Sequence, residues 1–498
     1  MFFRFIFFIN SILLISFYSH AALPPFPFVI ESLEKEHGAR DEIIVPETPE
    51  EPEKKILIKE FIPSDVKAPV AEASSLFPVP QGLEENVEFW VSVYTKYNNW
   101  DVILHDADYP SLVYEVVEAK QIMDDSISYR SKLRKINNII NSRKKYYKRL
   151  LIEIQNKVDA GETTNLSEEE KNLFEKFTHI EENKKFLRAT YKKRMRMQLG
   201  QRNNFILGLQ QSGKYLRYIE DIFTEMNMPR ELIRLIYVES MFNLKAYSKV
   251  GASGIWQFMR STGKRFLEIS YAIDERRDPI SATRAAANLL NQNYKLLKEW
   301  PIAITAYNHG ARGMLRAVNR VGSTDLKQII DNYRSGTFGF ASKNFYAQFL
   351  AAFEVESNSK NYFGEVARIE EIKFKEFILP DFVTFSAIRD LTGLDKEIIS
   401  DFNPALKEEV FSGHARIPKG YGLKLPENIF EDFVARYGEI PKDLKHDIQE
   451  KAKYYTVQRG DNLWTIGRKF NTSVDRIKRL NGIRNGRQLR AGTVLIMP

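Results

Sequence analysis

The spacing of apolar residues divides the chain into segments of different character. Residues 22–82 are rich in proline and glutamate and show no sustained period, which is typical of an extended linker. Residues 83–200 place isoleucine and leucine among charged side chains at helical spacing, so we expect a charged helical region. Residues 201–365 are denser in apolar side chains and in glycines. This segment predicts several helices joined by short loops.

The first residues show a short apolar run after a basic residue. Arg4 precedes an apolar stretch from Phe5 to Phe17, and small residues flank the bond after Ala21. This arrangement predicts a cleaved signal peptide over residues 1–21, with an uncleaved membrane anchor as the alternative. The chain contains no cysteine, which excludes structural disulfides and a thioether-linked lipid. We therefore expect a periplasmic or secreted protein that is not a lipoprotein and contacts membranes at most peripherally.

Residues 453–498 predict a small module of two strands and two helices. A strand begins at Tyr454, a turn follows at Gly460 and Asp461, and Asp461 or Asn462 caps the first helix. A second helix and a final strand complete the order βααβ.

A weaker copy of this pattern covers residues 374–428. The stretch 385–388 parallels 463–466, and Phe402-Asn403 parallels Leu480-Asn481. The copy lacks the Gly-Asp turn, so the sequence leaves open whether it packs on its neighbours or binds sugar.

The charge of the chain is unevenly distributed. Of the 498 residues, 73 are Lys or Arg and 65 are Asp or Glu, which gives a formal net charge of +8. The last 45 residues carry nine of the basic and two of the acidic residues. This local excess suggests that the C-terminal module contacts an anionic polymer. The rest of the sequence shows no stripe typical of nucleic-acid binding, so we expect no nucleic-acid partner.

One carboxyl group lies on the apolar face of a predicted helix that starts at Pro229. Leu232, Leu235, Ile236 and Glu239 follow at the spacing i, i+3, i+4, i+7. Burial disfavours the ionised carboxylate and raises its pKa, as a general acid near neutral pH requires. The alternative is a buried carboxylate that pairs with an arginine or caps a neighbouring helix.

Polar and aromatic side chains that suit a sugar follow this carboxyl group. Gly251 and Gly254 mark a turn, where glycine lets the backbone approach a ligand closely. A short helix is predicted after the turn, and a later apolar helix ends in polar and aromatic tips. The candidates are Ser248 before the turn, Gln257 and Met259 on the short helix, and Tyr307 and Asn308 at the end of the later one.

These segments resemble the Slt family of lytic transglycosylases, relatives of goose-type lysozyme with a helical lysozyme-like fold. The motifs that carry the resemblance are Glu239-Ser240, Gly251-Ala-Ser-Gly-Ile-Trp-Gln-Phe-Met259 and Ala306-Tyr-Asn-His-Gly310. The lead-in Gly208-Leu-Gln-Gln-Ser-Gly-Lys-Tyr-Leu216 is similar to the D-type membrane-bound branch.

The resemblance also implies roles for individual residues. Glu239 would be the single catalytic acid/base. In the last helix, Phe345 occupies the position where the family usually has tyrosine, and His309 replaces a small residue. The side chains implied to line the saccharide cleft are Ser248, Gln257, Met259, Tyr307, Asn308 and Tyr346.

The C-terminal module resembles LysM, a βααβ unit that binds chains containing N-acetylglucosamine. The resemblance implies a shallow sugar groove formed by Gly460, Asp461, Asn462 and Leu463, with Asn481 and Ile483 opposite.

Together these features predict a mainly α protein that acts as a peptidoglycan lytic transglycosylase. It would cleave the MurNAc–GlcNAc β-1,4 bond and give 1,6-anhydromuramyl products, because the motif blocks hold no second carboxylate for ordinary hydrolysis. A hydrolytic lysozyme-like muramidase and an inactive cell-wall-binding scaffold are the alternatives. We expect peptidoglycan as the partner and neither metal nor organic cofactor, since the sequence has no His-Glu-x-x-His motif, phosphate loop or dinucleotide fingerprint. The sequence identifies no protein partner.

Overall fold

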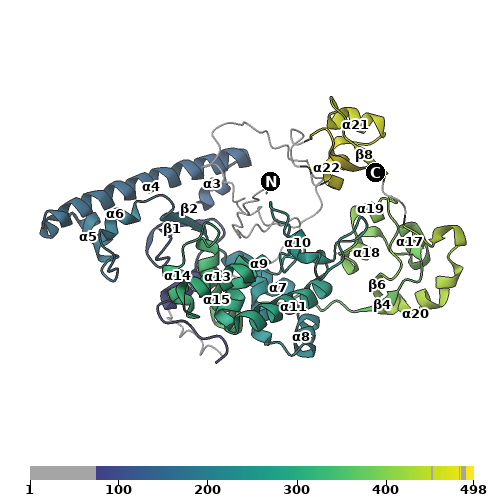
Figure 1. Cartoon of the computed structure of the whole chain (residues 1–498), viewed down its shortest axis with the longest axis horizontal. Coiled ribbons are helices and arrows are strands. Elements are labelled where there is room, and N and C mark those ends of the chain that lie inside the picture. Colours follow the sequence, from purple (N-terminus) through teal and green to yellow (C-terminus); the bar gives the residue numbers. More distant parts are fainter. Residues whose placement is uncertain (1–74, 450–452, 482, 484–488, 498) are drawn as a thin grey trace. The chain divides into compact units, whose positions relative to one another are not determined.

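The computed structural model describes residues 75–449, 453–481, 483 and 489–497 (Figure 1). These residues form two compact units. The first combines residues 75–257 with residues 283–370, and the second combines residues 258–282 with the described residues from 371 onward. The predicted signal peptide and residues 22–74 of the predicted linker lie outside the described residues. Within the described part, every helix is too short or too polar to cross a membrane.

Residues 83–200 are not purely helical, which corrects the sequence-based expectation. They contain a three-stranded antiparallel sheet in the order β2-β1-β3, made of β1 (Asp101–Asp106), β2 (Val113–Glu118) and β3 (Met195–Leu199). Each strand is a short run, and β1 and β2 are rich in valine and isoleucine, which favour strands. The helices of this region are α2 (Glu84–Thr95), α3 (Lys120–Met123), α4 (Tyr129–Asp159), α5 (Glu168–Glu175) and α6 (Lys185–Ala189).

The last residues of the predicted linker pack into the first unit. Phe77 is fully buried and its ring contacts those of Trp300 and Phe349. The carbonyl of Pro78 accepts a hydrogen bond from the hydroxyl of Tyr346 (2.9 Å). Residues 77 and 78 therefore belong to the folded unit, although they lie inside the linker expected over residues 22–82.

The remaining helices of the first unit include α9 and α12, which carry predicted catalytic motifs. The long helix α15 packs against α2, α9 and α12. The α-helices of the first unit after residue 200 are α7 (Arg202–Ser212), α8 (Leu216–Glu225), α9 (Leu235–Ser240), α11 (Pro279–Leu297, whose first turn belongs to the second unit), α12 (Trp300–His309), α13 (Ala311–Val321), α14 (Leu326–Asn332), α15 (Phe340–Ser357) and α16 (Ser359–Phe363).

The second unit joins a loop from the middle of the sequence to the C-terminal part of the chain. Residues 258–282, which include α10 (Arg260–Gly263), share a hydrophobic core with residues 371–446 through Ala272 and Ile273. The backbone N–H of Asp274 donates to the carbonyl of Ala405 (2.8 Å), and that of Lys407 donates to Ala272 (2.9 Å).

Two small modules of the second unit have the predicted βααβ order. The weaker copy consists of β4 (Phe374–Ile378), α17 (Phe385–Thr392), α18 (Lys396–Phe402) and β6 (Gly422–Pro426), and the C-terminal one of β8 (Lys453–Thr456), α21 (Leu463–Lys469), α22 (Val474–Asn481) and β9 (Val494–Met497). In each, the two outer strands pair antiparallel. The weaker copy adds β5 (Phe382–Val383), α19 (Glu408–Phe411), α20 (Glu427–Arg436) and β7 (Lys445–His446).

An asparagine holds each module together in the same way. The amide of Asn403 donates to the carbonyls of Ile399 and Lys424 and accepts from the N–H of Lys424. The amide of Asn481 makes the matching bonds to Ile477 and Ile496. The parallel between these two asparagines, predicted from the sequence, is therefore confirmed at the level of hydrogen bonds.

We expect the buried ion pair between Lys424 and Asp278 to stabilise the second unit. Both side chains are more than nine-tenths buried, so Lys424→Met would leave the Asp278 carboxylate without its partner. Breaking such a pair costs about 3–5 kcal/mol. The urea midpoint of the second unit should fall accordingly.

The matched control is Lys396→Met, which breaks an exposed pair with Glu408. An exposed pair contributes less than about 1 kcal/mol. Equal losses of stability in the two variants would show that the Lys424–Asp278 pair has no special role.

Candidate active site

Glu239 lies near the end of a short helix whose other side chains face the core. Pro229 precedes a 3-10 turn, Arg230–Arg234, that continues directly into α9. The sequence had suggested that Pro229 is the first residue of the helix. In the structure it stands just before the first turn. Leu232 and Ile236 are fully buried, as predicted, and Glu239 is half-buried.

Desolvation dominates the electrostatics of Glu239. Part of the side chain reaches solvent, but burial raises the pKa of its carboxyl group to about 8. Among the described residues, no other charged group contributes to this shift. Within the described ranges, Glu239 neither pairs with a basic side chain nor caps a helix, which removes the structural alternative considered for it.

The chain reverses sharply after Glu239. Met241 and Phe242 both have positive φ angles, 50° and 54°, and both are buried. Such conformations cost free energy in residues other than glycine and are common at functional sites. The hydroxyl of Ser240 donates to the carbonyl of Ile255 (2.8 Å) and so connects α9 to the glycine-containing loop. A β-carbon on Gly208 of α7 would lie 2.8 Å from the Met241 carbonyl oxygen, so α7 approaches this turn closely.

The loop of residues 246–257 is fixed by its own polar side chains. The Ser248 hydroxyl accepts the N–H of Ala252 (2.8 Å), and the Gln257 side chain donates to the Gly254 carbonyl (2.8 Å). Gln257 lies in a turn and Met259 is the extended residue before α10, so neither lies on a helix, which corrects the prediction; α10 begins only at Arg260. The positive φ of Gln257 (48°) explains why no helix forms there.

The end of α12 brings Tyr307 close to the catalytic candidate. The Tyr307 hydroxyl donates to the carbonyl of Trp256 (2.9 Å), and the charge of Glu239 adds to the burial that raises the pKa of Tyr307 well above its ordinary value. Asn308 is buried and accepts a hydrogen bond from Ser342 (2.7 Å). The structure therefore brings together Glu239, the 246–257 loop and Tyr307.

Two substitutions in the expected motif pattern are accommodated inside the fold. The ring of His309 contacts those of Tyr333 and Phe338, and burial lowers its pKa. The ring of Phe345 stacks on Tyr307, with centroids 6.4 Å apart.

Tyr346 does not have the environment expected of a cleft residue. It is fully buried, and its hydroxyl donates to Pro78, outside the predicted motifs. The sequence could not indicate this contact because Pro78 lies far away in a segment expected to be a linker.

In the C-terminal module, three of the predicted groove residues shape the turn and the start of α21. Asn462 caps α21, and the carboxylate of Asp461 accepts hydrogen bonds from the Tyr455 hydroxyl and the Gln458 N–H, which lower its pKa. Gly460 has a φ of 95° and makes the turn. The other residues of the predicted groove are the buried Leu463 and the half-buried Asn481 and Ile483.

Trp464 is an aromatic residue that the sequence analysis missed. Its side chain is 59% exposed, and the guanidinium of Arg468 lies 5.0 Å from the ring centroid. Exposed aromatic rings offer a face on which sugars stack. In the sequence, Trp464 follows directly after the predicted cap and groove residues 460–463, and this position was the signal that could have identified it.

Two domain models match the chain. A transglycosylase SLT domain matches residues 219–330, and a LysM domain matches residues 455–498. The chain carries an SLT domain and a LysM domain. The SLT match includes Glu239, the glycine-containing loop and the end of α12, so all three predicted motifs belong to it. SLT domains define a family of enzymes that act on peptidoglycan.

Curated proteins also match the chain. The chain is 27% identical over 293 residues to the membrane-bound lytic murein transglycosylase D of Escherichia coli K12, and equally to that of strain O6:H1. The match covers 56% of this chain and 62% of the relative. Among solved structures, an inactive mutant of the lytic transglycosylase Slt from Pseudomonas aeruginosa is similar, with 14% identity and a TM-score of 0.26 over 50% of this chain and 38% of that one.

Two further kinds of site were considered in the described residues: clusters of metal ligands and cavities. In the ranges that the structure describes, no three His, Asp or Glu side chains converge as metal ligands would. A surface cavity of about 500 Å³ is lined by residues of α2, β2 and the end of α5, including Glu88, Phe89 and Lys176. None of the SLT motif residues lines this cavity.

The raised pKa of Glu239 predicts a pH-dependent difference in stability between the native protein and Glu239→Gln. The folded state holds the proton up to about pH 8, whereas an unfolded chain releases it near the ordinary value of 4.5. The folded state therefore binds more protons in this window, and its stability falls as the pH rises through it. Glutamine does not titrate, so the native protein should lose stability relative to the variant between about pH 5 and about pH 8.

Urea unfolding of both proteins at several pH values measures this difference. Glu231→Gln, in the preceding 3-10 turn, serves as the control. Parallel stability curves for the native protein and Glu239→Gln would contradict a desolvated carboxyl group at this position.

Proposed function

We propose that this protein is a peptidoglycan lytic transglycosylase that cleaves the MurNAc–GlcNAc β-1,4 bond by intramolecular transfer. The observation that supports this most is the carboxyl group of Glu239, which is protonated near neutral pH through burial alone and lies within the SLT domain. The E. coli relatives are named lytic murein transglycosylases.

Glu239 would serve as acid and then as base. With a pKa of about 8 it carries a proton that it can donate to the leaving glycosidic oxygen. The resulting carboxylate would accept the proton of the muramyl C6 hydroxyl as that hydroxyl attacks C1 of its own ring. This intramolecular attack replaces a water nucleophile and needs no second carboxylate, since tethering supplies a large effective concentration.

The neighbouring residues would bind and orient the glycan. Tyr307 and Gln257 are both half-buried, and each is held by a hydrogen bond to a backbone carbonyl. Ser248 and Asn308 are buried and engaged in hydrogen bonds within the protein, which suits positioning of the loop and of α12 rather than wide contact with the sugar. Met259 precedes α10 and is half-buried; it stays a candidate through the resemblance alone.

The LysM domain would attach the enzyme to the glycan strands of the cell wall. Its proposed groove comprises Gly460, Asp461, Asn462, Leu463, Asn481 and Ile483, and we add the exposed ring of Trp464 to this set. Tethering a glycan binder to a catalytic domain raises the local concentration of substrate. Export through residues 1–21 stays a prediction, and the chain offers no cysteine for a lipid anchor.

Glu239→Gln should abolish clearing of a peptidoglycan suspension. The variant keeps the shape of the side chain but cannot transfer the proton, so the rate should fall on the order of 100-fold or more. Turbidity of sacculi measures the rate, with Glu231→Gln as the matched control. Near-native activity of pure Glu239→Gln would rule out this mechanism.

The products should end in 1,6-anhydromuramic acid. Intramolecular attack leaves out water, so each new end is lighter by one water than a lysozyme product, and digestion in heavy-oxygen water should add no label. Mass spectrometry of digested sacculi measures both. Labelled reducing ends would identify a hydrolase, and the absence of any new ends would identify a cell-wall-binding scaffold.

A further inference from the structure

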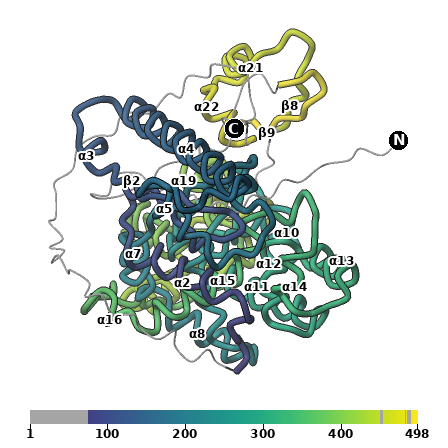
Figure 2. Tube along the Cα trace, turned by 90° about the vertical axis from the view of Figure 1, so that its left-hand side faces the viewer, coloured from purple at the N-terminus to yellow at the C-terminus, as the bar shows by residue number. Residues whose placement is uncertain are grey.

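The helix α4 carries an unusual concentration of positive charge. Its 31 residues include ten basic and two acidic side chains, and no acidic residue occurs before Glu153. The net charge of this one helix, +8, equals the formal net charge of the whole chain. The sequence analysis had assigned the basic excess to the C-terminus, because acidic residues elsewhere mask α4 in the overall count. Figure 2 shows α4 as a long straight element.

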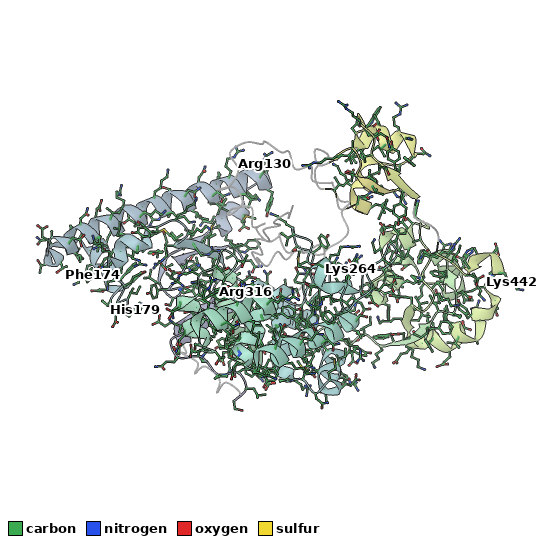
Figure 3. All side chains as sticks on the ribbon, viewed as in Figure 1. Arg130, Phe174, His179, Lys264, Arg316 and Lys442 are labelled. Atoms are coloured by element: carbon green, nitrogen blue, oxygen red, sulfur yellow. The ribbon has the colours of Figure 1, made fainter. Side chains whose placement is uncertain are left out.

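The two faces of α4 differ in character. Ile136, Ile140 and Ile154 are buried on one face and pack into two hydrophobic clusters of the first unit. The opposite face carries cations at the spacing i, i+4, i+15 and i+18, all within about a quarter of the helix circumference. These residues, called the basic stripe below, are Arg130, Arg134, Lys145 and Lys148. They extend over about 27 Å, from the end marked by Arg130 in Figure 3.

The cations of the basic stripe lack acidic partners in the described part of the chain. Other basic residues of α4 do have them: Lys135 pairs with Asp125, and Arg143 with Glu115. Like charges one turn apart, such as Arg130 and Arg134, destabilise a helix slightly. An external anion would remove this repulsion, which makes the stripe a surface suited to a polyanion.

We propose that the basic stripe is a docking surface for the carboxylate-bearing stem peptides of peptidoglycan; the identity of this polymer rests on the proposed function. Charge complementarity carries the argument, since stem peptides present repeated carboxylates along a strand. Asn138 and Asn141 lie between the cations and can donate hydrogen bonds to such groups.

The surface of α4 fits a polymer better than a membrane. A helix that lies in a lipid interface presents tryptophan, phenylalanine or leucine to the acyl chains. The exposed apolar side chains of α4 are single isoleucines, Ile139 and Ile152. A stem-binding stripe would act together with the glycan-binding LysM domain, because two weak sites on one chain give avidity for the same polymer.

The test uses the full chain with all four stripe residues changed to glutamine. The matched control changes four exposed lysines outside α4 and outside the sites described above: Lys96, Lys171, Lys192 and Lys295. Both variants lose the same net charge. Three probes separate the possible partners: native sacculi, sacculi whose carboxylates have been converted to neutral amides, and vesicles of anionic phospholipid.

We expect the stripe variant to bind native sacculi about tenfold more weakly than the control at low salt, with a smaller difference at high salt. On amidated sacculi the two variants should bind equally. Equal binding of both variants to native sacculi would overturn the proposal, and so would a loss confined to the vesicles, which would identify a membrane as the partner.

Turnover of short soluble glycans separates this proposal from the proposed function. The stripe variant should keep native turnover, because the stripe lies outside the catalytic motifs. If the native protein itself does not cleave these glycans, the proposed function fails, while the sacculus binding data still decide whether the stripe binds stem peptides.

Discussion

The partial burial of one carboxyl group, without a charged partner among the described residues, is the constraint on which the proposed site depends. Glu239 has no counter-ion in the described residues, so its proton is held by burial alone. The chain reverses immediately after α9, through two residues in the left-handed region, and packs closely against α7 at Gly208. Ser240 then fixes the loop that follows, through the Ile255 carbonyl. The turn, the packing against Gly208 and the Ser240 bond together fix the backbone around Glu239.

The sequence predicted the parts of the site that depend on local order. The apolar spacing predicted that Leu232, Leu235 and Ile236 are buried, which the structure confirms, whereas Glu239 is only half-buried. The cap of α21, predicted at Asp461 or Asn462, is Asn462. Features that depend on distant contacts were not predicted. The bond from Tyr346 to Pro78 and the pairing of β1 with β3 join residues far apart in the sequence, which no local pattern reveals. The valine and isoleucine runs of β1 and β2, in contrast, were a local signal that the helical interpretation overlooked.

The division into two units shows a further limit of reading the chain in sequence order. Residues 258–282 lie inside the SLT match, yet they share their core with residues 371–446. A domain boundary drawn from sequence alone, at residue 365, separates segments that pack together. The buried Lys424–Asp278 pair illustrates why: each residue is unremarkable in its own segment, and only their juxtaposition satisfies both charges.

The weaker βααβ copy differs from the LysM domain at the turn before its first helix. Thr384 caps its first helix as Asn462 caps that of the LysM domain, so Phe382 and Val383 correspond to the Gly460 and Asp461 of the sugar-groove turn. In the copy, these two residues form β5, which pairs with β7, and Val383 also exchanges backbone hydrogen bonds with Ile417. Val383 is fully buried. The backbone that would make an open turn is thus engaged with its own chain. This arrangement favours packing over sugar binding, since a glycan would have to displace β7 and residue 417 before it could reach the equivalent groove.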